Sequence, residues 1–116
     1  MSFEAGEIVY LPFPFTDRAS NKHRPALVLS IKSFNDKHKH LVLAMVTSAK
    51  NAPCPSDVPI VDLKTAGLPN PSVIRMKVFT LDERLILGVL GKLSSHDKRS
   101  FLKQMGANLG IAPQGA

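Results

Sequence analysis

Two groups of polar residues have the types and positions that phosphate chemistry requires. Arg24 stands before Pro25, whose ring keeps the preceding residue extended, and a guanidinium presents forked, permanently charged donors that match phosphate oxygens. Thr47 and Ser48 end the apolar run 41–46, where two hydroxyls can donate to a phosphoryl oxygen or position a ribose hydroxyl. The alternatives are a surface arginine and ordinary strand-end hydroxyls, and the residues alone leave both open.

A second pair of cations is separated by one residue. Arg75 and Lys77 lie in the strand-like run Val73–Phe79, so we expect both side chains on one face of that strand. Together with Arg24 they would form a cationic groove for a nucleic-acid backbone. The alternative is the solvated face of a half-buried strand.

Three histidines could take part in chemistry. His23 could serve as an acid or base, and it is equally suited to be one more loop cation. His38 and His40 form an H-x-H pattern, which on a strand would place both imidazoles on one face, as in some metal sites. The sequence offers no clear third ligand, so we favour a solvated basic hairpin and expect neither a metal nor another cofactor.

The distribution of charge suits a polyanionic partner. The formal net charge is +6, and six of the fifteen Lys and Arg residues lie between Arg18 and His40, against one carboxylate, Asp36. Such a region favours nucleic acid or an acidic protein as partner, with a solvated basic face as the alternative. No GxSxG, P-loop, HExxH or GxGxxG motif is present in the sequence.

The hydropathy pattern predicts where the chain resides. No apolar run approaches the roughly 20 residues that a membrane span requires. The first residues lack the basic start and apolar stretch of a signal peptide. We therefore expect a cytoplasmic protein that does not contact membranes.

The candidate residues depend on short strands for their positions. Mostly apolar runs, separated by loops rich in Pro, Asn and Ser, predict strands over Glu7–Pro12, Pro25–Ile31, His40–Thr47, Val58–Val61, Val73–Phe79 and Leu85–Leu93. A last element begins with the helix-start pattern of Ser94 and Asp97 and continues with an apolar stripe at helical spacing, made of Phe101, Leu102, Met105 and Leu109. The expected fold is a single mostly β domain over residues 1–116, a small barrel of five to seven strands with an amphipathic C-terminal helix.

Several pieces of the sequence, in one order, resemble the MazF/PemK family of toxin ribonucleases from bacterial toxin–antitoxin systems. They are GEIVYLPFPFTD (6–17), RPALVLS (24–30), MVTSA (45–49), SVIRMKVFTLD (72–82) and GKLSSHDKRSFLKQM (91–105). The resemblance implies an SH3-like barrel, usually a homodimer, that is neutralised by an acidic antitoxin. It implies metal-independent cleavage of single-stranded RNA by attack of the ribose 2′-hydroxyl, which leaves a 2′,3′-cyclic phosphate and a 5′-hydroxyl end.

The resemblance also implies roles for individual residues. Arg24 is the principal catalytic cation, Thr47 is its partner, and Ser48 lies close by. The loop 16–23 would flank the site and contact RNA or antitoxin, and strand 72–82 would contact the substrate. The RNA-binding residues implied in this way are Thr16, Arg18, Lys22, His23, Arg75 and Lys77.

Two positions depart from the family pattern. Lys77 stands where some members have an acid, so it cannot be a carboxylate base and would add phosphate affinity. Phe79 stands where other members have an arginine. There are two alternatives to an endoribonuclease. One is a non-enzymatic toxin that acts by binding, as the gyrase-poisoning CcdB relatives do, and the other is an inactive RNA- or DNA-binding barrel.

Overall fold

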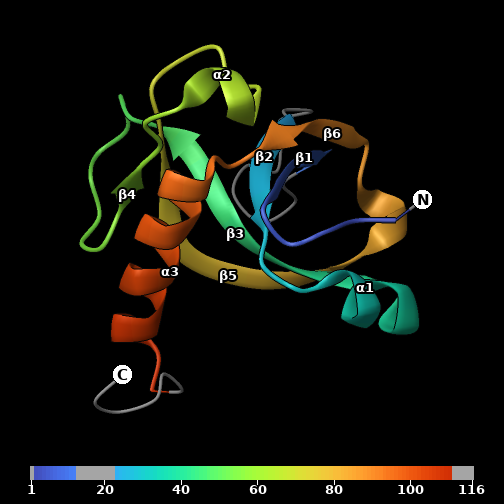
Figure 1. Ribbon diagram of the computed structural model, residues 1–116. Coiled ribbons are helices and arrows are strands. Elements are labelled where there is room, and N and C mark those ends of the chain that lie inside the picture. The colour runs from blue at the N-terminus through green and yellow to red at the C-terminus, as the bar shows by residue number, and fades with distance from the viewer. Residues whose placement is uncertain (1, 13–22, 111–116) are drawn as a thin grey trace.

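The candidate residues are carried by one curled antiparallel sheet. The computed structural model describes residues 2–12 and 23–110 of the chain. The elements in chain order are β1 (Glu7–Pro12), β2 (His23–Val28), α1 (Lys32–His38), β3 (His40–Ser48), β4 (Val58–Pro59), α2 (Leu63–Ala66), β5 (Ser72–Asp82), the 3-10 turn η1 (Glu83–Leu85), β6 (Gly88–Lys92) and α3 (Ser95–Asn108). The six strands form a single sheet in the order β4-β5-β3-β2-β1-β6, curled into a half-barrel (Figure 1). The expected fold class, mostly β with a C-terminal helix, is confirmed.

Alternate residues of the central strands pack into two separate cores. Ile8 and Leu27 belong to one core, which also includes Phe101 of α3, whereas Val9 and Val28 belong to the other. Successive side chains of a strand point to opposite faces of a sheet, so these apolar runs are buried on both faces. This two-sided burial explains why the runs read as nearly continuous apolar stretches.

The C-terminal helix begins where the sequence predicts. The Ser94 hydroxyl oxygen accepts a hydrogen bond from the Asp97 N–H at 3.1 Å, which caps α3. The apolar stripe is only partly covered. Phe101 is buried and Met105 packs against the same core, but Leu102 and Leu109 remain 46% and 36% exposed.

Two helices lie where the sequence predicts other structure. Residues 32–38 form α1 rather than part of a basic hairpin, and Leu63–Ala66 forms α2 at the start of a predicted loop. Helix α1 has no apolar stripe to reveal it, because its fully buried residue is Asn35. The Asn35 amide donates to the carbonyls of Phe3 and Ser30, and these contacts hold the helix in place. Neither these helices nor α3, the other helix of the described ranges, is long and apolar enough to cross a membrane.

Helix α2 is fixed against the edge strand β6 by a glycine. Gly67 ends α2 in the left-handed region with φ 75°, and a Cβ atom there would lie 2.1 Å from the carbonyl oxygen of Leu90. Only glycine permits this backbone approach. The chain that follows α2 is thereby placed above the ends of β2 and β3, where it forms one wall of the site.

Candidate functional site

The site lies where β2 and β3 separate. The two strands pair at Ala26↔Met45, Leu27↔Ala44 and Val28↔Leu43. The pairs that would follow, Pro25 with Val46 and Arg24 with Thr47, do not form, and Pro25 has no N–H to donate. Strand β2 continues beside β1, and β3 continues beside β5, so a cavity opens between β2 and β3.

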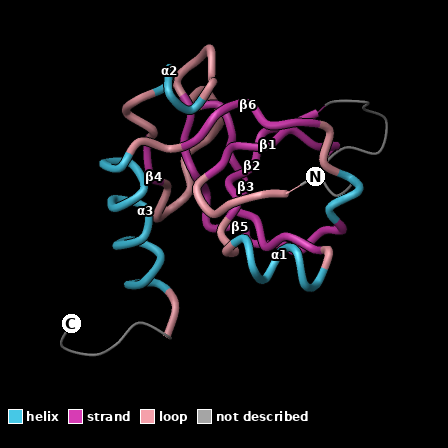
Figure 2. Tube along the Cα trace, turned by 45° about the vertical axis from the view of Figure 1, so that its right-hand side comes forward, coloured by secondary structure: helices cyan, strands magenta, loops and turns pink. Residues whose placement is uncertain are grey.

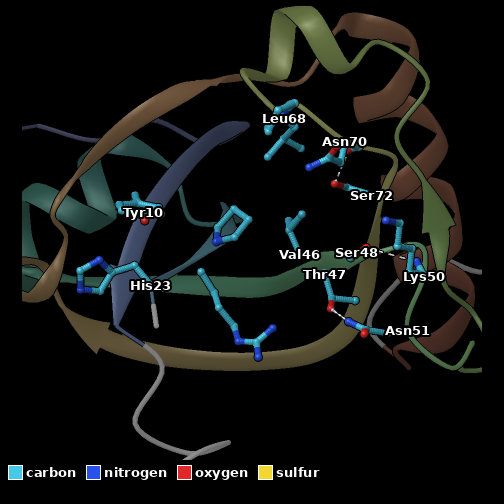
Figure 3. Close-up of a pocket in the computed structure, with 13 residues that line it drawn as sticks. Tyr10, His23, Val46, Thr47, Ser48, Lys50, Asn51, Leu68, Asn70 and Ser72 are labelled. Atoms are coloured by element: carbon cyan, nitrogen blue, oxygen red, sulfur yellow. Dashed lines mark hydrogen bonds between the residues drawn. The ribbon is translucent and has the colours of Figure 1, made fainter. Parts of the chain in front are cut away.

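This cavity has a volume of about 710 Å³, which lies within the range of ligand-binding sites. The following residues line it: Tyr10, His23, Arg24, Pro25, Val46, Thr47, Ser48, Lys50, Asn51, Leu68, Pro69, Asn70 and Ser72 (Figure 3). The structure thus brings together four of the predicted residues, Arg24, Thr47, Ser48 and His23, from two strands.

Arg24 is free to bind an anion. It is half-buried on β2, where its backbone pairs with Leu11 of β1. Among the described residues, none forms a hydrogen bond or an ion pair with its guanidinium. A fixed backbone with an uncommitted guanidinium is what a phosphate anchor requires.

Thr47 is the most enclosed polar residue of the cavity, at 4% exposure. Its Oγ1 accepts a hydrogen bond of 2.6 Å from Nδ2 of Asn51, and Figure 3 shows these two side chains facing each other. Because the amide occupies an acceptor position, the hydroxyl hydrogen of Thr47 can be donated to another oxygen. The neighbouring Ser48 Oγ likewise accepts from the Lys50 N–H at 3.2 Å. Both hydroxyls therefore still have a hydrogen that they can donate.

His23 is the first residue of β2 rather than a loop residue. Its ring packs edge-to-face against Tyr10, with centroids 5.3 Å apart and an interplanar angle of 79°. His23 is exposed, whereas Tyr10 is half-buried. The aromatic contact fixes an imidazole at the cavity rim within the same strand as Arg24.

Arg75 and Lys77 are not among the residues that line the cavity. The register of β5 against β3 slips between Ala44↔Val78 and Met45↔Arg75, so Met76 and Lys77 are extra residues in β5. The expected simple alternation therefore does not hold between Arg75 and Lys77. Lys77 is exposed, and Arg75 is engaged elsewhere.

Arg75 forms a forked ion pair with Asp57. Its Nε lies 3.1 Å from Oδ1 and its Nη2 3.0 Å from Oδ2, with side-chain exposures of 12% and 11%. Hydrogen bonding from Arg75 is the main cause that lowers the pKa of Asp57. Burial of the carboxylate opposes it, and the Cys54 N–H lowers the pKa further. The pair is thus ionised on both sides at neutral pH.

The contribution of this pair to stability is expected to disappear in acid. Since the pKa of Asp57 is lowered in the folded state, its stabilisation is present above the unfolded value of about 4 and is lost as pH falls through the folded value. Asp57→Asn should lower the free energy of unfolding by roughly 1–3 kcal/mol at pH 7. Urea denaturation from pH 7 to pH 2 should show this difference narrowing below about pH 4. A difference that stays constant over that range would contradict the assignment.

Several residues of the cavity were not predicted from the sequence. Asn51 orients Thr47, Asn70 points into the open space in Figure 3, and Lys50 and Ser72 also line the walls. Asn51 and Lys50 follow the Thr47-Ser48 pair directly, so proximity in sequence was the signal that could have found them. Asn70 and Ser72 had no such signal, because Ser72 reaches the cavity by pairing with Ser48 across β3 and β5, and Asn70 lies in the chain between α2 and β5. Of the predicted residues, Thr16, Arg18 and Lys22 lie outside the described residues.

The described part of the basic region, residues 23–40, does not form one surface at the cavity. Arg24 lines the cavity, but Lys32, Lys37 and Lys39 belong to α1 or follow it. Helix α1 lies at the opposite end of the molecule from α2 (Figures 1 and 2). Strand β3 begins beside α1 at His40 and reaches the cavity at Val46, six residues later, roughly 20 Å at the usual strand rise.

The two histidines of the H-x-H pattern do not share a strand. His38 ends α1, Lys39 adopts a left-handed conformation with φ 57°, and His40 begins β3. Nδ1 of His40 lies 3.0 Å from the His38 carbonyl oxygen. Across residues 2–12 and 23–110, no group of three or more His, Cys, Asp or Glu side chains is placed to hold a metal ion.

The chain is similar to known proteins both in sequence and in structure. Residues 4–106 match the model of a family described as PemK-like, MazF-like toxins of type II toxin–antitoxin systems. The search among curated proteins found no match.

Solved structures of similar shape include MazF of Deinococcus radiodurans. In its complex with MazE it is 26% identical, with a TM-score of 0.75 over 96% of this chain and 99% of that one. MazF determined by itself is 25% identical with the same TM-score and coverage. An endoribonuclease from a mycobacterial species, solved with its cognate antitoxin, is 14% identical with a TM-score of 0.72 over 95% of each chain, which establishes the shared fold.

Proposed function

Because the chain belongs to the PemK-like, MazF-like family of toxins of type II toxin–antitoxin systems, we propose that it is an endoribonuclease that cleaves single-stranded RNA. Toxins of this family are known as endoribonucleases. The observation that carries the proposal is the cavity between β2 and β3. It is lined by Arg24, whose guanidinium has no partner among the described residues, and by Thr47, whose hydroxyl accepts from Asn51.

The proposed reaction is an internal transfer of the phosphoryl group. The ribose 2′-hydroxyl attacks the adjacent phosphorus, the bond to the 5′-oxygen breaks, and the products are a 2′,3′-cyclic phosphate and a 5′-hydroxyl end. Negative charge grows on the phosphoryl oxygens that do not leave, and donors held in place beforehand stabilise it. Arg24 supplies a permanent charge and forked donors, and Thr47 and Ser48 supply hydroxyl donors, so these three residues are the proposed catalytic group.

Proton transfer has one candidate base at the rim of the cavity. An arginine remains protonated at physiological pH, so Arg24 stabilises the charged intermediate and can donate a proton to the leaving 5′-oxygen. His23, held against Tyr10 in the same strand, or a water molecule would accept the proton of the 2′-hydroxyl. Lys77 has no carboxylate to offer and is assigned to RNA binding, together with Thr16, Arg18 and Lys22.

The proposed partners follow from the family and from the charge. The MazF relatives crystallised with MazE support an antitoxin for this chain, and the net charge of +6 favours an acidic one. A homodimer is also proposed. The antitoxin would compete with RNA for the cavity and the basic residues around it.

The test is incubation of the antitoxin-free protein with single-stranded RNA in excess EDTA, followed by chemical analysis of the ends. We expect cleavage with 2′,3′-cyclic phosphate and 5′-hydroxyl ends. The same sequence made with 2′-deoxyribose should remain uncut, because it lacks the nucleophile. Uncut RNA with folded protein, or cleavage that EDTA abolishes, would overturn the proposal. Growth arrest without new RNA ends would indicate a toxin that acts by binding.

A further inference from the structure

The loop between β3 and β4, residues 49–57, is tied to the sheet by Arg75. We propose that Arg75 is a positioning residue, which acts through Asp57 and the Ala52 carbonyl to hold Asn51 against Thr47 in the cavity. The inference rests on the proposed function for its effect on cleavage. It assigns to Arg75 a role other than direct contact with RNA.

The side chain of Arg75 holds this loop at two points. Arg75 Nη2 donates to the Ala52 carbonyl at 2.9 Å, and the same side chain binds both carboxylate oxygens of Asp57. Asp57 Oδ2 also accepts from the Cys54 N–H at 2.9 Å. One guanidinium thus connects the middle and the end of the loop to β5, which is the neighbour of β3 in the sheet.

Among the described residues, few other contacts hold the middle of this loop. Residues 51–53 are exposed, so no buried apolar side chain anchors them. At the start of the loop, the Ala49 N–H donates to the Pro71 carbonyl and the Asn51 N–H to the Ser48 carbonyl. Without Arg75, the position of Ala52 and the residues after it would depend on the turn at Cys54 alone.

The bond to Ala52 links Arg75 to the cavity. Asn51 precedes Ala52, so the bond from Arg75 to the Ala52 carbonyl constrains the residue that contacts Thr47. The 2.6 Å bond from Asn51 holds Thr47 Oγ1 in place and leaves its hydroxyl hydrogen available to be donated in the cavity. A displacement of about 1 Å in such a group can reduce a reaction rate about a hundredfold. Arg75 can therefore affect catalysis without contacting RNA.

The surroundings of Arg75 argue against direct contact with an RNA phosphate. Arg75 is outside the cavity lining, its side chain is 12% exposed, and its charge is balanced by Asp57 at 3.0 Å. A phosphate would have to displace this carboxylate to reach the fork. That exchange would leave Asp57 without its cation, and the loop would lose the contact with Arg75 that holds it to β5.

The decisive experiment is a double-mutant cycle between Arg75→Gln and Asn51→Ala. Each single variant is expected to lower kcat by about tenfold to a hundredfold with a smaller change in KM. In the Asn51→Ala background, the added Arg75→Gln should cost less than about threefold, because both act through one contact. Additive losses would overturn the proposal.

Two further variants separate positioning from phosphate binding. Arg75→Lys keeps the charge but cannot bridge Asp57 and Ala52 with a planar fork, so it should resemble Arg75→Gln. A phosphate-contacting residue would instead be largely rescued by lysine. Arg84→Gln is the matched control, because Arg84 makes a similar forked pair with Asp82 on an exposed surface and should retain full activity.

Salt dependence of binding gives an independent measurement. With an uncleavable 2′-deoxy oligonucleotide, Arg75→Gln and Arg84→Gln should show the same slope of log affinity against log salt concentration. Direct phosphate contact by Arg75 would reduce the slope of its variant alone by about 0.7, and that result would overturn the proposal.

Hydrogen exchange tests the positioning without any reaction. In Arg75→Gln the backbone amides of Asn51 and Cys54 should exchange at least about fivefold faster than in the wild type, whereas those of the central strands should not change. Unchanged exchange would overturn the proposal even if the protein cuts RNA. If the wild type cuts no RNA but these amides still exchange faster in Arg75→Gln, the proposed function is wrong and Arg75 nevertheless positions the loop.

Discussion

The Arg24→Ala variant is expected to cleave single-stranded RNA about a hundredfold to a thousandfold more slowly than the wild type, with its folding intact. Among the described residues that line the cavity, Arg24 is the only arginine. Its removal takes away the permanent charge that would stabilise the phosphoryl oxygens as the 2′-hydroxyl attacks. Single-turnover cleavage with saturating protein measures this effect on the chemical step itself.

The stability of Arg24→Ala should change little. Within the described part of the chain its guanidinium has no partner to lose, so only the packing of its stem is affected, at a cost of about 1 kcal/mol or less. Arg99→Ala is the matched control, because it removes one exposed positive charge from α3, outside the cavity lining. Full cleavage by Arg24→Ala, or an equal loss in Arg99→Ala, would remove Arg24 from its proposed role.

The largest loss of stability is expected from Asp97→Ala. Asp97 is 1% exposed, and its carboxylate accepts from the N–H groups of Val61 at 3.1 Å and Asp62 at 2.9 Å. Alanine would leave the backbone donors of these two part-buried hydrogen bonds without their acceptor, and it would remove a side chain that is itself fully buried. Each unsatisfied donor costs about 1–3 kcal/mol, so we expect a loss of about 3–4 kcal/mol. This would lower Tm by more than about 10 °C in a domain of this size.

Ser94→Ala provides the comparison for Asp97→Ala. It removes the other side chain of the same helix start but leaves the Asp97 carboxylate in place. Loss of this cap alone should cost about 1 kcal/mol. Thermal and urea denaturation of both variants measure the two losses. If Asp97→Ala lost no more stability than Ser94→Ala, the carboxylate would contribute only as a helix-start residue.

Much of the fold was predictable because its determinants are local. The strands β1 and β3 follow apolar runs whose ends the sequence marks with loop residues, and α3 follows the spacing of Ser94, Asp97 and Phe101. The helix α1 was not predictable in this way. Its buried residue is Asn35, whose partner Phe3 is 32 residues away, so no local pattern of apolar residues reveals it.

The candidate site was predictable in part for a similar reason. Arg24 and Thr47 are marked by a following proline and by the end of an apolar run, and the structure places both in one cavity. Arg75 was predicted as an RNA-binding residue, and the structure places it outside the cavity lining and pairs it with Asp57. Its partner Asp57 is 18 residues earlier, and nothing in either segment predicts that the two meet.

By itself, the sequence determined the residue types at the ends of β2 and β3, the helix start at Ser94 and the family to which the chain belongs. These depend on neighbours along the chain, whose backbone preferences and side-chain spacing are local properties. Only the tertiary structure decided that β2 and β3 separate after Ala26↔Met45, and that Arg75 holds the 49–57 loop. It also decided that the carboxylate of Asp97 binds backbone donors 35 and 36 residues earlier. Such contacts depend on how the sheet curls, because curling brings together polar groups that are distant in sequence.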